Sequence, residues 1–172
     1  MDAETRADFT AFVESRSAAL SRAAMALTGH RQQAEDLLQT ALARSMRHWA
    51  RLRTGQPEAY VRTVMYRQYA TWWRRRSRPW ETPTAELPEI AGQDHTAGVD
   101  LSLALTTALR RLAPRHRAVL ILRYLEDRPN EEIADILGCT QATVRSQTTR
   151  ALRRLRELCP ELDTRTVQET WQ

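Results

Sequence analysis

Residues 130–157 read NEEIADILGCTQATVRSQTTRALRRLRE and decide the fold of the C-terminal part of the chain. Ala134 is small where two helices would cross closely, and Gly138 permits the left-handed backbone of a tight turn. Val144 is β-branched and can fill the gap between the two helices. These three residues stand at positions 5, 9 and 15 of a twenty-residue unit that starts at Asn130. The stretch therefore predicts a helix-turn-helix.

We expect the two helices of this motif to span residues 130–137 and 141–158, with Asn130 as the N-cap of the first helix. Gln147 and Thr148 stand where an apolar residue often seats the second helix, so the rotation of that helix stays open. A solvated, protein-binding face is one interpretation of its outer side, but the positive charge of the region favours the major groove of DNA. The outward residues are Gln141, Ala142, Thr143, Arg145, Ser146, Thr149 and Arg150.

Charge is distributed unevenly along the 172 residues, whose formal net charge is +5 and whose 26 basic residues are all arginine. Residues 60–80 hold 6 arginines and no acid, residues 81–100 hold 5 acids and no base, and residues 101–159 hold 11 arginines against 6 acids. Because arginine binds phosphate through a planar fork, two basic modules around an acidic spacer suit a nucleic-acid partner. A GC-rich genome is the alternative explanation for the missing lysine, although it does not account for where the charge lies.

Apolar residues recur at helical spacing over most of the chain, whereas the alternating runs typical of strands do not occur. The predicted fold is all-α, with two small helical domains joined by a flexible acidic linker, the C-terminal one a four-helix domain. In the N-terminal part we expect a loop over residues 51–56 and helices at about residues 5–27, 31–50 and 57–76. In the C-terminal part we expect helices at about residues 101–112, 114–125, 130–137 and 141–158.

The third helix and its continuation, YVRTVMYRQYATWWRRRSRPW over residues 60–80, interleave aromatic residues with arginines. Aromatic rings can stack on unpaired bases while guanidinium groups hold the backbone, as in single-strand binding. Some of the rings must instead pack in the core, since Tyr60, Val64 and Trp72 are expected to share a face. The run at 74–76 is either a solvated helix end or a nucleic-acid contact, and its closeness to the aromatic rings favours the contact.

Other classes of protein are disfavoured by what the sequence lacks. No stretch approaches the roughly 20 apolar residues of a membrane span, and the charged N-terminus does not resemble a signal peptide, so we expect a cytoplasmic protein. Cys139 and Cys159 have no partner at redox or metal-ligand spacing and are expected to be buried or half-buried residues. The 4 histidines are scattered, and neither paired carboxylates nor a phosphate loop occurs. We therefore expect no enzyme, no metal and no cofactor.

Three stretches together resemble a known family. They are AEDLLQTALARSMRHW at 34–49, PEAYVRTVMYRQYATWWRRRSR at 57–78, and LRRLAPRHRAVLILRYLEDRPNEEIADILGCTQATVRSQTTRALRRLR at 109–156. This layout resembles an extracytoplasmic-function (group IV) RNA polymerase sigma factor of the sigma-70 family, and WWRRRSR suggests an actinobacterial branch. The resemblance implies an alternative sigma factor, which binds core RNA polymerase and directs promoter-specific transcription initiation through −10 and −35 elements.

The resemblance also implies a division of labour along the chain. Residues 1–78 would form sigma region 2, which docks on core polymerase and recognises and melts the −10 element. Residues 79–100 would be a linker similar to region 3.2. Residues 101–159 would form sigma region 4, whose helix-turn-helix recognises the −35 element, and residues 160–172 would be a C-terminal tail.

Site residues follow from the same resemblance. The second helix looks like the surface that docks on the clamp of the largest polymerase subunit, through Glu35, Asp36, Leu38, Gln39 and Arg44. The following loop and the third helix look like the reader of a single-stranded −10 element, through Arg53, Arg62, Arg67, Trp72, Trp73, Arg74 and Arg75. At a duplex −35 element, Ala142, Arg145, Ser146 and Thr149 would approach bases, with Gln141 beside them, and Arg115, Thr143 and Arg150 would hold phosphates.

Two further partners and two alternative functions remain. The resemblance allows contact with the flap of core polymerase and with an anti-sigma factor. The first alternative is a stand-alone helix-turn-helix regulator that binds duplex operators as a dimer, which a gel shift with and without core polymerase would distinguish. The second alternative is an enzyme acting on nucleic acid, for which the sequence offers no catalytic constellation.

Overall fold

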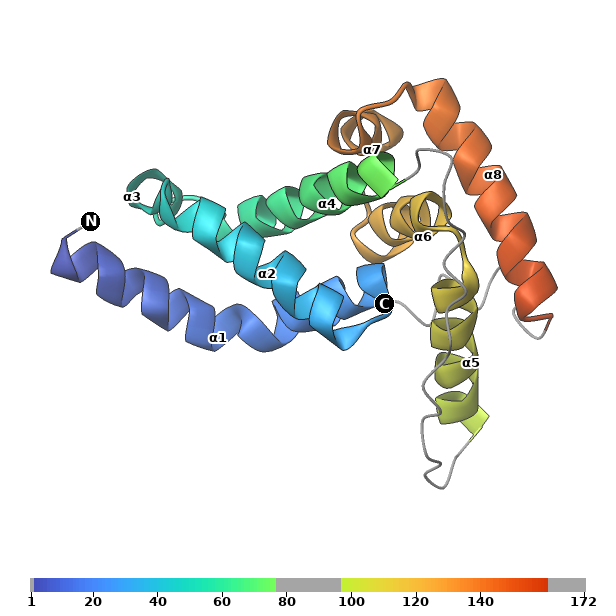
Figure 1. Ribbon diagram of the computed structural model, residues 1–172, viewed down its shortest axis with the longest axis horizontal. Coiled ribbons are helices and arrows are strands. Elements are labelled where there is room, and N and C mark those ends of the chain that lie inside the picture. The colour runs from blue at the N-terminus through green and yellow to red at the C-terminus, as the bar shows by residue number, and fades with distance from the viewer. Residues whose placement is uncertain (1, 77–96, 161–172) are drawn as a thin grey trace.

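The computed structural model describes residues 2–76 and 97–160, which are helical and contain no strand (Figure 1). The all-α prediction is confirmed for these residues. The N-terminal helices are α1 (Ala3–Thr28), α2 (Arg31–Met46), α3 (Trp49–Leu52) and α4 (Pro57–Arg76). The C-terminal helices are α5 (Ala97–Arg111), α6 (Pro114–Leu120), the π-helical segment η1 (Ile121–Leu125), α7 (Asn130–Leu137) and α8 (Gln141–Leu158).

The predicted linker and tail lie mostly beyond the described residues. Of the linker, only residues 97–100 are described, and they form the start of α5, four residues before the predicted helix. Residues 77–96 and 161–172 lie outside the described ranges. None of the helices within those ranges has both the length and the apolar content to cross a membrane.

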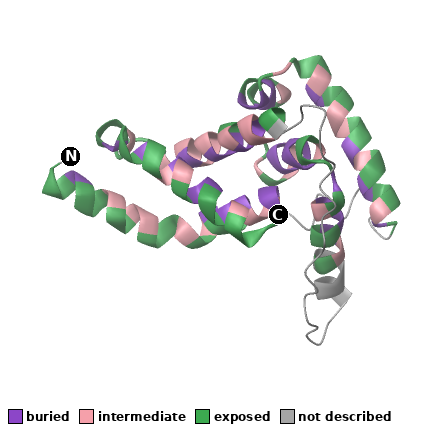
Figure 2. Ribbon diagram, in the orientation of Figure 1, coloured by how far each residue is buried: buried purple, intermediate pink, exposed green. Residues whose placement is uncertain are grey.

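The N-terminal domain is built on α1 and α2, which a short turn at Gly29 joins into a pair, with α4 packed against α2 (Figure 1). Asp2 caps the start of α1 by accepting a hydrogen bond from the Thr5 N–H at 2.7 Å. Gly29 ends the helix with φ 72°, a left-handed conformation in which glycine has no steric cost. Buried residues from all three helices form the domain core (Figure 2).

The second helix ends earlier than the sequence predicts. α2 stops at Met46, and a separate helical turn, α3, occupies part of the predicted loop over residues 51–56. Ser45 is buried, and its hydroxyl donates to the Ala41 carbonyl at 2.8 Å, a contact that often bends a helix. Trp49, just beyond the end of α2, is 3% exposed, and its ring centroid lies 5.0 Å from that of Phe9. The chain thus leaves the predicted helix where the indole packs against α1.

The buried face of α4 also differs from the prediction. Tyr60, Val64 and Trp72 are only half-buried. The core face lies one position further along the helix and consists of Val61, Met65, Tyr66, Tyr69 and Ala70. Two of the tyrosines are thus packing residues, which confirms that only part of the aromatic set can face a ligand.

The helix-turn-helix is confirmed over the predicted residues. Gly138 adopts φ 65° and ψ 47° between α7 and α8, and Val144 is fully buried at the junction. The predicted cap of α7 is wrong, because Pro129 occupies the N-cap position and Asn130 is already the first helical residue. The Asn130 side chain instead accepts a weak hydrogen bond from Arg123 at 3.4 Å.

A second apolar cluster lies between α8 and the helices α5 and α6. Ala151 and Leu155 on the inner side of α8 pack with Leu105 of α5, Leu112 just after it and Leu120 of α6, all nearly fully buried. Cys159 belongs to this cluster, and Cys139 is half-buried with its thiol free. The predicted behaviour of both cysteines is confirmed.

The two domains pack directly against each other. Buried residues of α1, α2 and α4 form one continuous cluster with Val119, Ile133, Ile136 and Leu137 of the C-terminal domain. Figure 1 shows α7 lying over the end of α4 and α6 lying beneath it. The structure is therefore a closed arrangement of the two domains, which the sequence did not indicate.

Replacing Gly138 by alanine should destabilise the protein, because the left-handed conformation costs an L-residue about 1–2 kcal/mol. The new Cβ would also approach Arg74 Nη1 to 2.5 Å, so that side chain must move. Gly55→Ala is the matched control, since its Cβ would meet only ordinary contacts at 3.7 Å. Urea unfolding followed by circular dichroism measures both, and equal midpoints would contradict the assignment of the turn.

Candidate nucleic-acid interface

α8 presents one continuous exposed stripe along its outer face. The residues of this stripe are Gln141, Ala142, Arg145, Ser146, Thr149 and Arg150, and all six are exposed. Their spacing of one, four, five, eight and nine residues places them on one side of an α-helix. Val144, Ala151 and Leu155 on the opposite side are buried. The rotation of the helix, which the sequence left open, is therefore fixed by the core.

The start of α8 is shaped by its own hydrogen bonds. Thr140 caps the helix by accepting from the Thr143 N–H at 3.1 Å, and Thr143 is half-buried. Ser146 donates its hydroxyl proton to the Thr143 carbonyl, and Thr149 donates to that of Arg145. Both hydroxyl oxygens keep lone pairs for a donor from a base edge.

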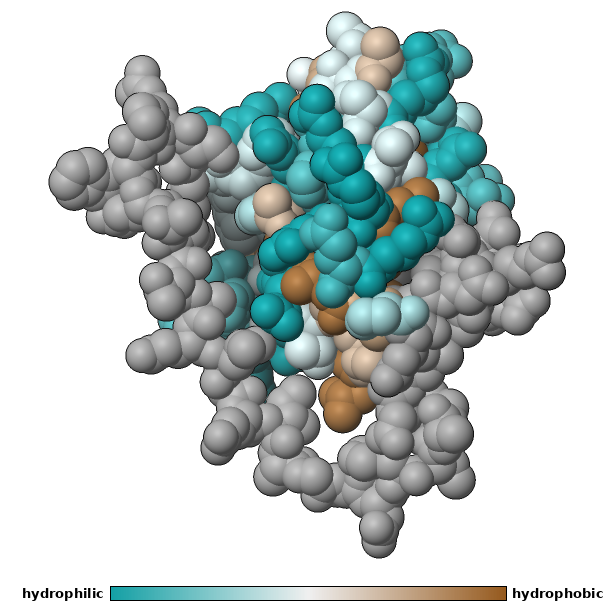
Figure 3. All heavy atoms as spheres, turned by 90° about the vertical axis from the view of Figure 1, so that its right-hand side faces the viewer, coloured by the Kyte–Doolittle hydropathy of each residue, from teal (hydrophilic) through white to brown (hydrophobic). Residues whose placement is uncertain are grey.

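Positive charge surrounds this stripe. Arg145 and Arg150 form no ion pair with any residue that the structure describes, and Arg115 at the start of α6 is exposed. Figure 3 views the side on which α8 lies and shows a broad hydrophilic surface there. Burial lowers the pKa of the neighbouring His116, and repulsion from Arg115 adds to the shift. At neutral pH the positive charge of this face therefore comes from its arginines rather than from His116.

The seven predicted residues of the −10 set do not form a single face. Arg67 and Arg75 are exposed on α4, whereas Trp72 and Trp73 are half-buried and packed against the core. Arg53, beyond α3, binds back to α1 through Asp8 at 2.7 Å. Within the proposed −10 set, Arg67 and Arg75 thus face solvent, whereas the two tryptophans and Arg53 make contacts within the protein.

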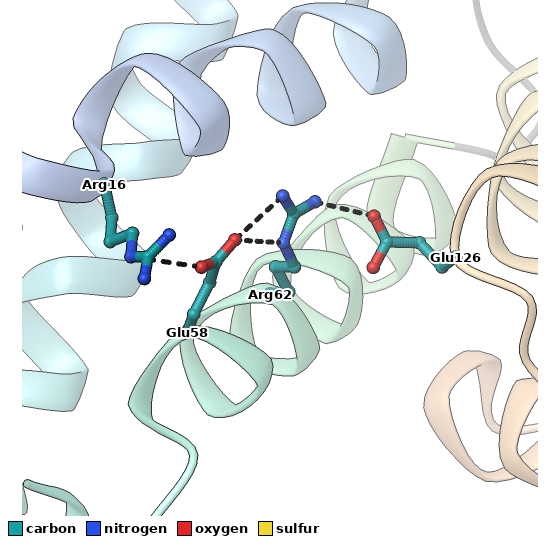
Figure 4. Close-up of polar contacts among 4 residues, drawn as sticks. All are labelled: Arg16, Glu58, Arg62 and Glu126. Atoms are coloured by element: carbon teal, nitrogen blue, oxygen red, sulfur yellow. Dashed lines mark hydrogen bonds and ion pairs between the residues drawn. The ribbon is translucent and has the colours of Figure 1, made fainter. Parts of the chain in front are cut away.

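Arg62 is the most strongly engaged member of this set. Its guanidinium binds Glu58 on the same helix at 3.0 Å and Glu126, after η1, at 2.6 Å (Figure 4). Arg16 of α1 binds the other oxygen of Glu58 at 3.5 Å, so four charged side chains form a chain from one domain to the other. Burial lowers the pKa of Arg62, but the charges of Glu126 and Glu58 outweigh it and raise the pKa overall.

Arg74 also contacts the C-terminal domain. Its Nη1 donates to the Leu137 carbonyl at 3.0 Å. This carbonyl lies at the C-terminal end of α7, where the helix dipole attracts a cation. Although Arg74 is exposed as a residue, one of its donors is thus occupied by the helix-turn-helix.

α2 presents a polar face of the kind predicted for polymerase docking. Glu35, Asp36, Gln39 and Arg44 are exposed, and Glu35 pairs with Arg31 at 2.8 Å. Leu38 is only 9% exposed and packs with the apolar core, so in this structure it adds little to the exposed face of α2.

Arg117 is a buried charged residue that sequence reasoning missed. It is 6% exposed, and its donors reach the Leu27 carbonyl at the end of α1 and the Arg110 and Leu112 carbonyls at the end of α5. Burial lowers its pKa, although a guanidinium remains protonated. Its position in the sequence could have indicated this burial, because Arg117 stands three residues before Leu120 and therefore on the apolar side of α6.

Both domains match known protein families. Residues 12–79 match the family described as Sigma-70 region 2, and residues 102–155 match the one described as Sigma-70, region 4. The chain is 39% identical over 164 residues to an RNA polymerase sigma-E factor of Streptomyces coelicolor, covering 94% of this chain and 92% of that protein. It is 32% identical over 159 residues to the ECF RNA polymerase sigma factor SigL of Mycobacterium tuberculosis, covering 88% and 89%.

A solved structure resembles the whole arrangement. It is that of the sigma factor RpoE in complex with the anti-sigma factor NepR from Bartonella quintana, with a TM-score of 0.59 and 27% sequence identity. The superposition covers 88% of this chain and 96% of that one. The similarity therefore extends across both domains.

The lowered pKa of His116 predicts a loss of stability in mild acid. The unfolded chain takes up a proton below a pH of about 6.5 while folded His116 resists it, so the free energy of unfolding falls as pH decreases through that value. His116→Gln should remove this part of the dependence, and His30→Gln, at an exposed position, should retain it. Urea unfolding at several pH values measures the slopes. Identical slopes for both variants and the wild type would contradict the effect.

Proposed function

The chain belongs to the extracytoplasmic-function group of the sigma-70 family of RNA polymerase sigma factors, and from this premise we propose how its surfaces divide promoter recognition. As an alternative sigma factor it directs promoter-specific transcription initiation and is not an enzyme. A stand-alone regulator is not favoured, because the similarity includes residues 12–79 as well as the helix-turn-helix. The domains are residues 1–78, the linker 79–100, and residues 101–159, followed by the tail 160–172.

The exposed stripe on α8 is the observation on which the proposed −35 contact rests. Its small and hydrogen-bonding residues lie on one face, and a helix enters the major groove with such a face toward the base edges. Ala142, Arg145, Ser146 and Thr149 approach bases, with Gln141 at the edge of the contact. Arg115, Thr143 and Arg150 bind phosphates on either side.

α4 and the turn before it form the proposed −10 contact. Arg67 and Arg75 are accessible to the DNA backbone as the chain stands. Trp72 and Trp73 each expose part of a ring that can stack on an unpaired base. Arg53, Arg62 and Arg74 complete the set, but each first has to leave its present partner.

The exposed face of α2 is the proposed docking surface for the polymerase clamp, through Glu35, Asp36, Gln39 and Arg44. The C-terminal domain would meet the flap. The protein would act in the cytoplasm, where polymerase and DNA are located. An anti-sigma factor is a further proposed partner, because the solved sigma factor that resembles this chain is bound to one.

Run-off transcription with core polymerase on genomic fragments tests the proposal and identifies the promoters. Arg145→Ala should reduce specific transcripts about tenfold or more, since one base-reading arginine contributes about 1–3 kcal/mol. Arg6→Ala is the control, because it removes the same charge from an exposed position of α1 that belongs to no proposed DNA contact. Equal loss in both variants, or wild-type transcription by Arg145→Ala, would refute the proposed −35 contact.

Promoter melting tests the −10 contact separately. Arg67→Ala and Arg75→Ala should each reduce permanganate reactivity of promoter thymines by several-fold, because each removes one phosphate contact to the open strand. The control is Arg6→Ala, which removes the same charge from an exposed position of α1. If all three variants melt the promoter as well as the wild type does, α4 does not hold the open strand through these arginines.

A further inference from the structure

Gln147 is a polar residue on the inner face of α8. It lies three residues after Val144 and four before Ala151, both fully buried, so the three side chains share one side of the helix. Gln147 itself is half-buried, and its Oε1 is buried without a hydrogen-bond partner among the described residues. Because a buried amide oxygen without a donor is destabilising, an apolar residue would pack better here unless a donor is close by.

The side chain that Gln147 meets is His116 of α6. The two helices pack together (Figure 1), and while burial lowers the pKa of His116, its interaction with the Gln147 side chain raises it. His116 Nε2 is also buried and forms no hydrogen bond within the described part of the chain. Each side chain thus carries one unsatisfied buried atom, and the two are complementary, because a ring nitrogen can donate and an amide oxygen can accept.

Two exposed arginines flank this pair. Arg115 precedes His116 in α6, and Arg150 lies one turn beyond Gln147 in α8. After burial, the charges of Arg115 and Arg150 lower the pKa of His116, and none of the described groups that shift this pKa is a carboxylate. Both arginines belong to the proposed phosphate contacts at the −35 element. The charges that oppose a second proton on the imidazole are therefore the charges that bound DNA neutralises.

We propose that His116 is a positioning residue for −35 recognition, which holds α8 through a hydrogen bond from Nε2 to Gln147 Oε1 that DNA binding completes with uptake of one proton. The proposal rests on the proposed −35 contact, because Arg115 and Arg150 act here through the phosphates that they bind. His116 itself contacts no base. It acts through Gln147, which keeps nearby Ser146 and Thr149 in a fixed orientation toward the base edges.

The proton on His116 determines whether this hydrogen bond forms. A neutral imidazole carries its proton on one of its two nitrogens, and when Nε2 lacks it, lone pairs of Nε2 and Oε1 face each other. An imidazolium carries both protons, so Nε2 always donates. In the free chain, burial and the two arginine charges oppose this state. Phosphates bound to the arginines remove the electrostatic part of that opposition.

DNA binding and protonation of His116 therefore strengthen each other. The pKa of His116 is lowered in the free chain and rises when phosphates screen Arg115 and Arg150, so the DNA-bound state holds more protons than the free state. The affinity for the −35 element then increases as the pH falls toward about 6.5 and below.

The test uses the full chain with core polymerase and a promoter fragment identified by run-off transcription. A gel shift measures affinity for the intact fragment and for one with a scrambled −35 element, from about pH 8 to about pH 6. The ratio of the two affinities is the −35 discrimination, in which the pH dependence of the other promoter contacts cancels. Circular dichroism shows that each variant is folded over this pH range.

Three variants separate the roles of the two side chains. His116→Gln keeps an amide donor but cannot take up a proton, and Gln147→Leu fills its position without an oxygen. His30→Gln is the control, because it removes an exposed histidine that belongs to no proposed DNA contact.

The −35 discrimination of the wild type should increase about three- to tenfold from about pH 8 to about pH 6, since one pKa unit corresponds to a tenfold change. His30→Gln should show the same increase. His116→Gln should keep at least the wild-type discrimination at the higher pH and show no increase, and Gln147→Leu should lose most of the increase. A flat wild-type profile would overturn the proposal, as would an undiminished increase in either His116→Gln or Gln147→Leu.

The same measurement distinguishes failure of this proposal from failure of the −35 contact. If scrambling the −35 element weakens wild-type binding equally at every pH, the −35 contact stands and the role of His116 is wrong. If scrambling has no effect at any pH, α8 does not read that element, and the role of His116 falls with the proposed contact.

Discussion

The closed structure depends on one buried cation, Arg117. Its guanidinium has no acidic partner among its hydrogen-bond acceptors, which are three main-chain carbonyls at the ends of α1 and α5. Helix C-termini carry partial negative charge and unsatisfied carbonyls, so they can accept hydrogen bonds from both terminal nitrogens of a buried guanidinium without a carboxylate. Gly29 makes room for it, because a Cβ there would lie 3.1 Å from Arg117 Nη1. One side chain of α6 thereby joins the last turn of α1 to the C-terminal domain.

The same chemistry recurs where the domains meet at α4. Arg74 donates to the carbonyl end of α7, and Arg62 adds the contact with Glu126. An arginine that can satisfy helix ends can also bind phosphate, because both interactions use the same planar donors. This shared chemistry explains why a DNA-binding protein can use its arginines to close upon itself.

Sequence reasoning located the helix-turn-helix residue by residue, because Ala134, Gly138 and Val144 each meet a local steric requirement. It failed where long-range packing decided the outcome. α2 ended earlier than predicted, with Trp49 packed on Phe9 just beyond it, and the core face of α4 lay one position further along than predicted. Leu38, which the resemblance places at the polymerase contact, packs mainly on the apolar side of α2. The contacts of Arg117 and Glu126 depend on how two domains meet, which no local pattern encodes.

The central claim is that the exposed stripe on α8 contacts the −35 element of the promoter. A gel shift with core polymerase tests it most directly, by comparing a promoter fragment with one whose −35 element is scrambled. The account predicts that scrambling weakens binding several-fold for the wild type and has little effect on Arg145→Ala, which has already lost a base contact. An equal loss for both proteins would contradict the account.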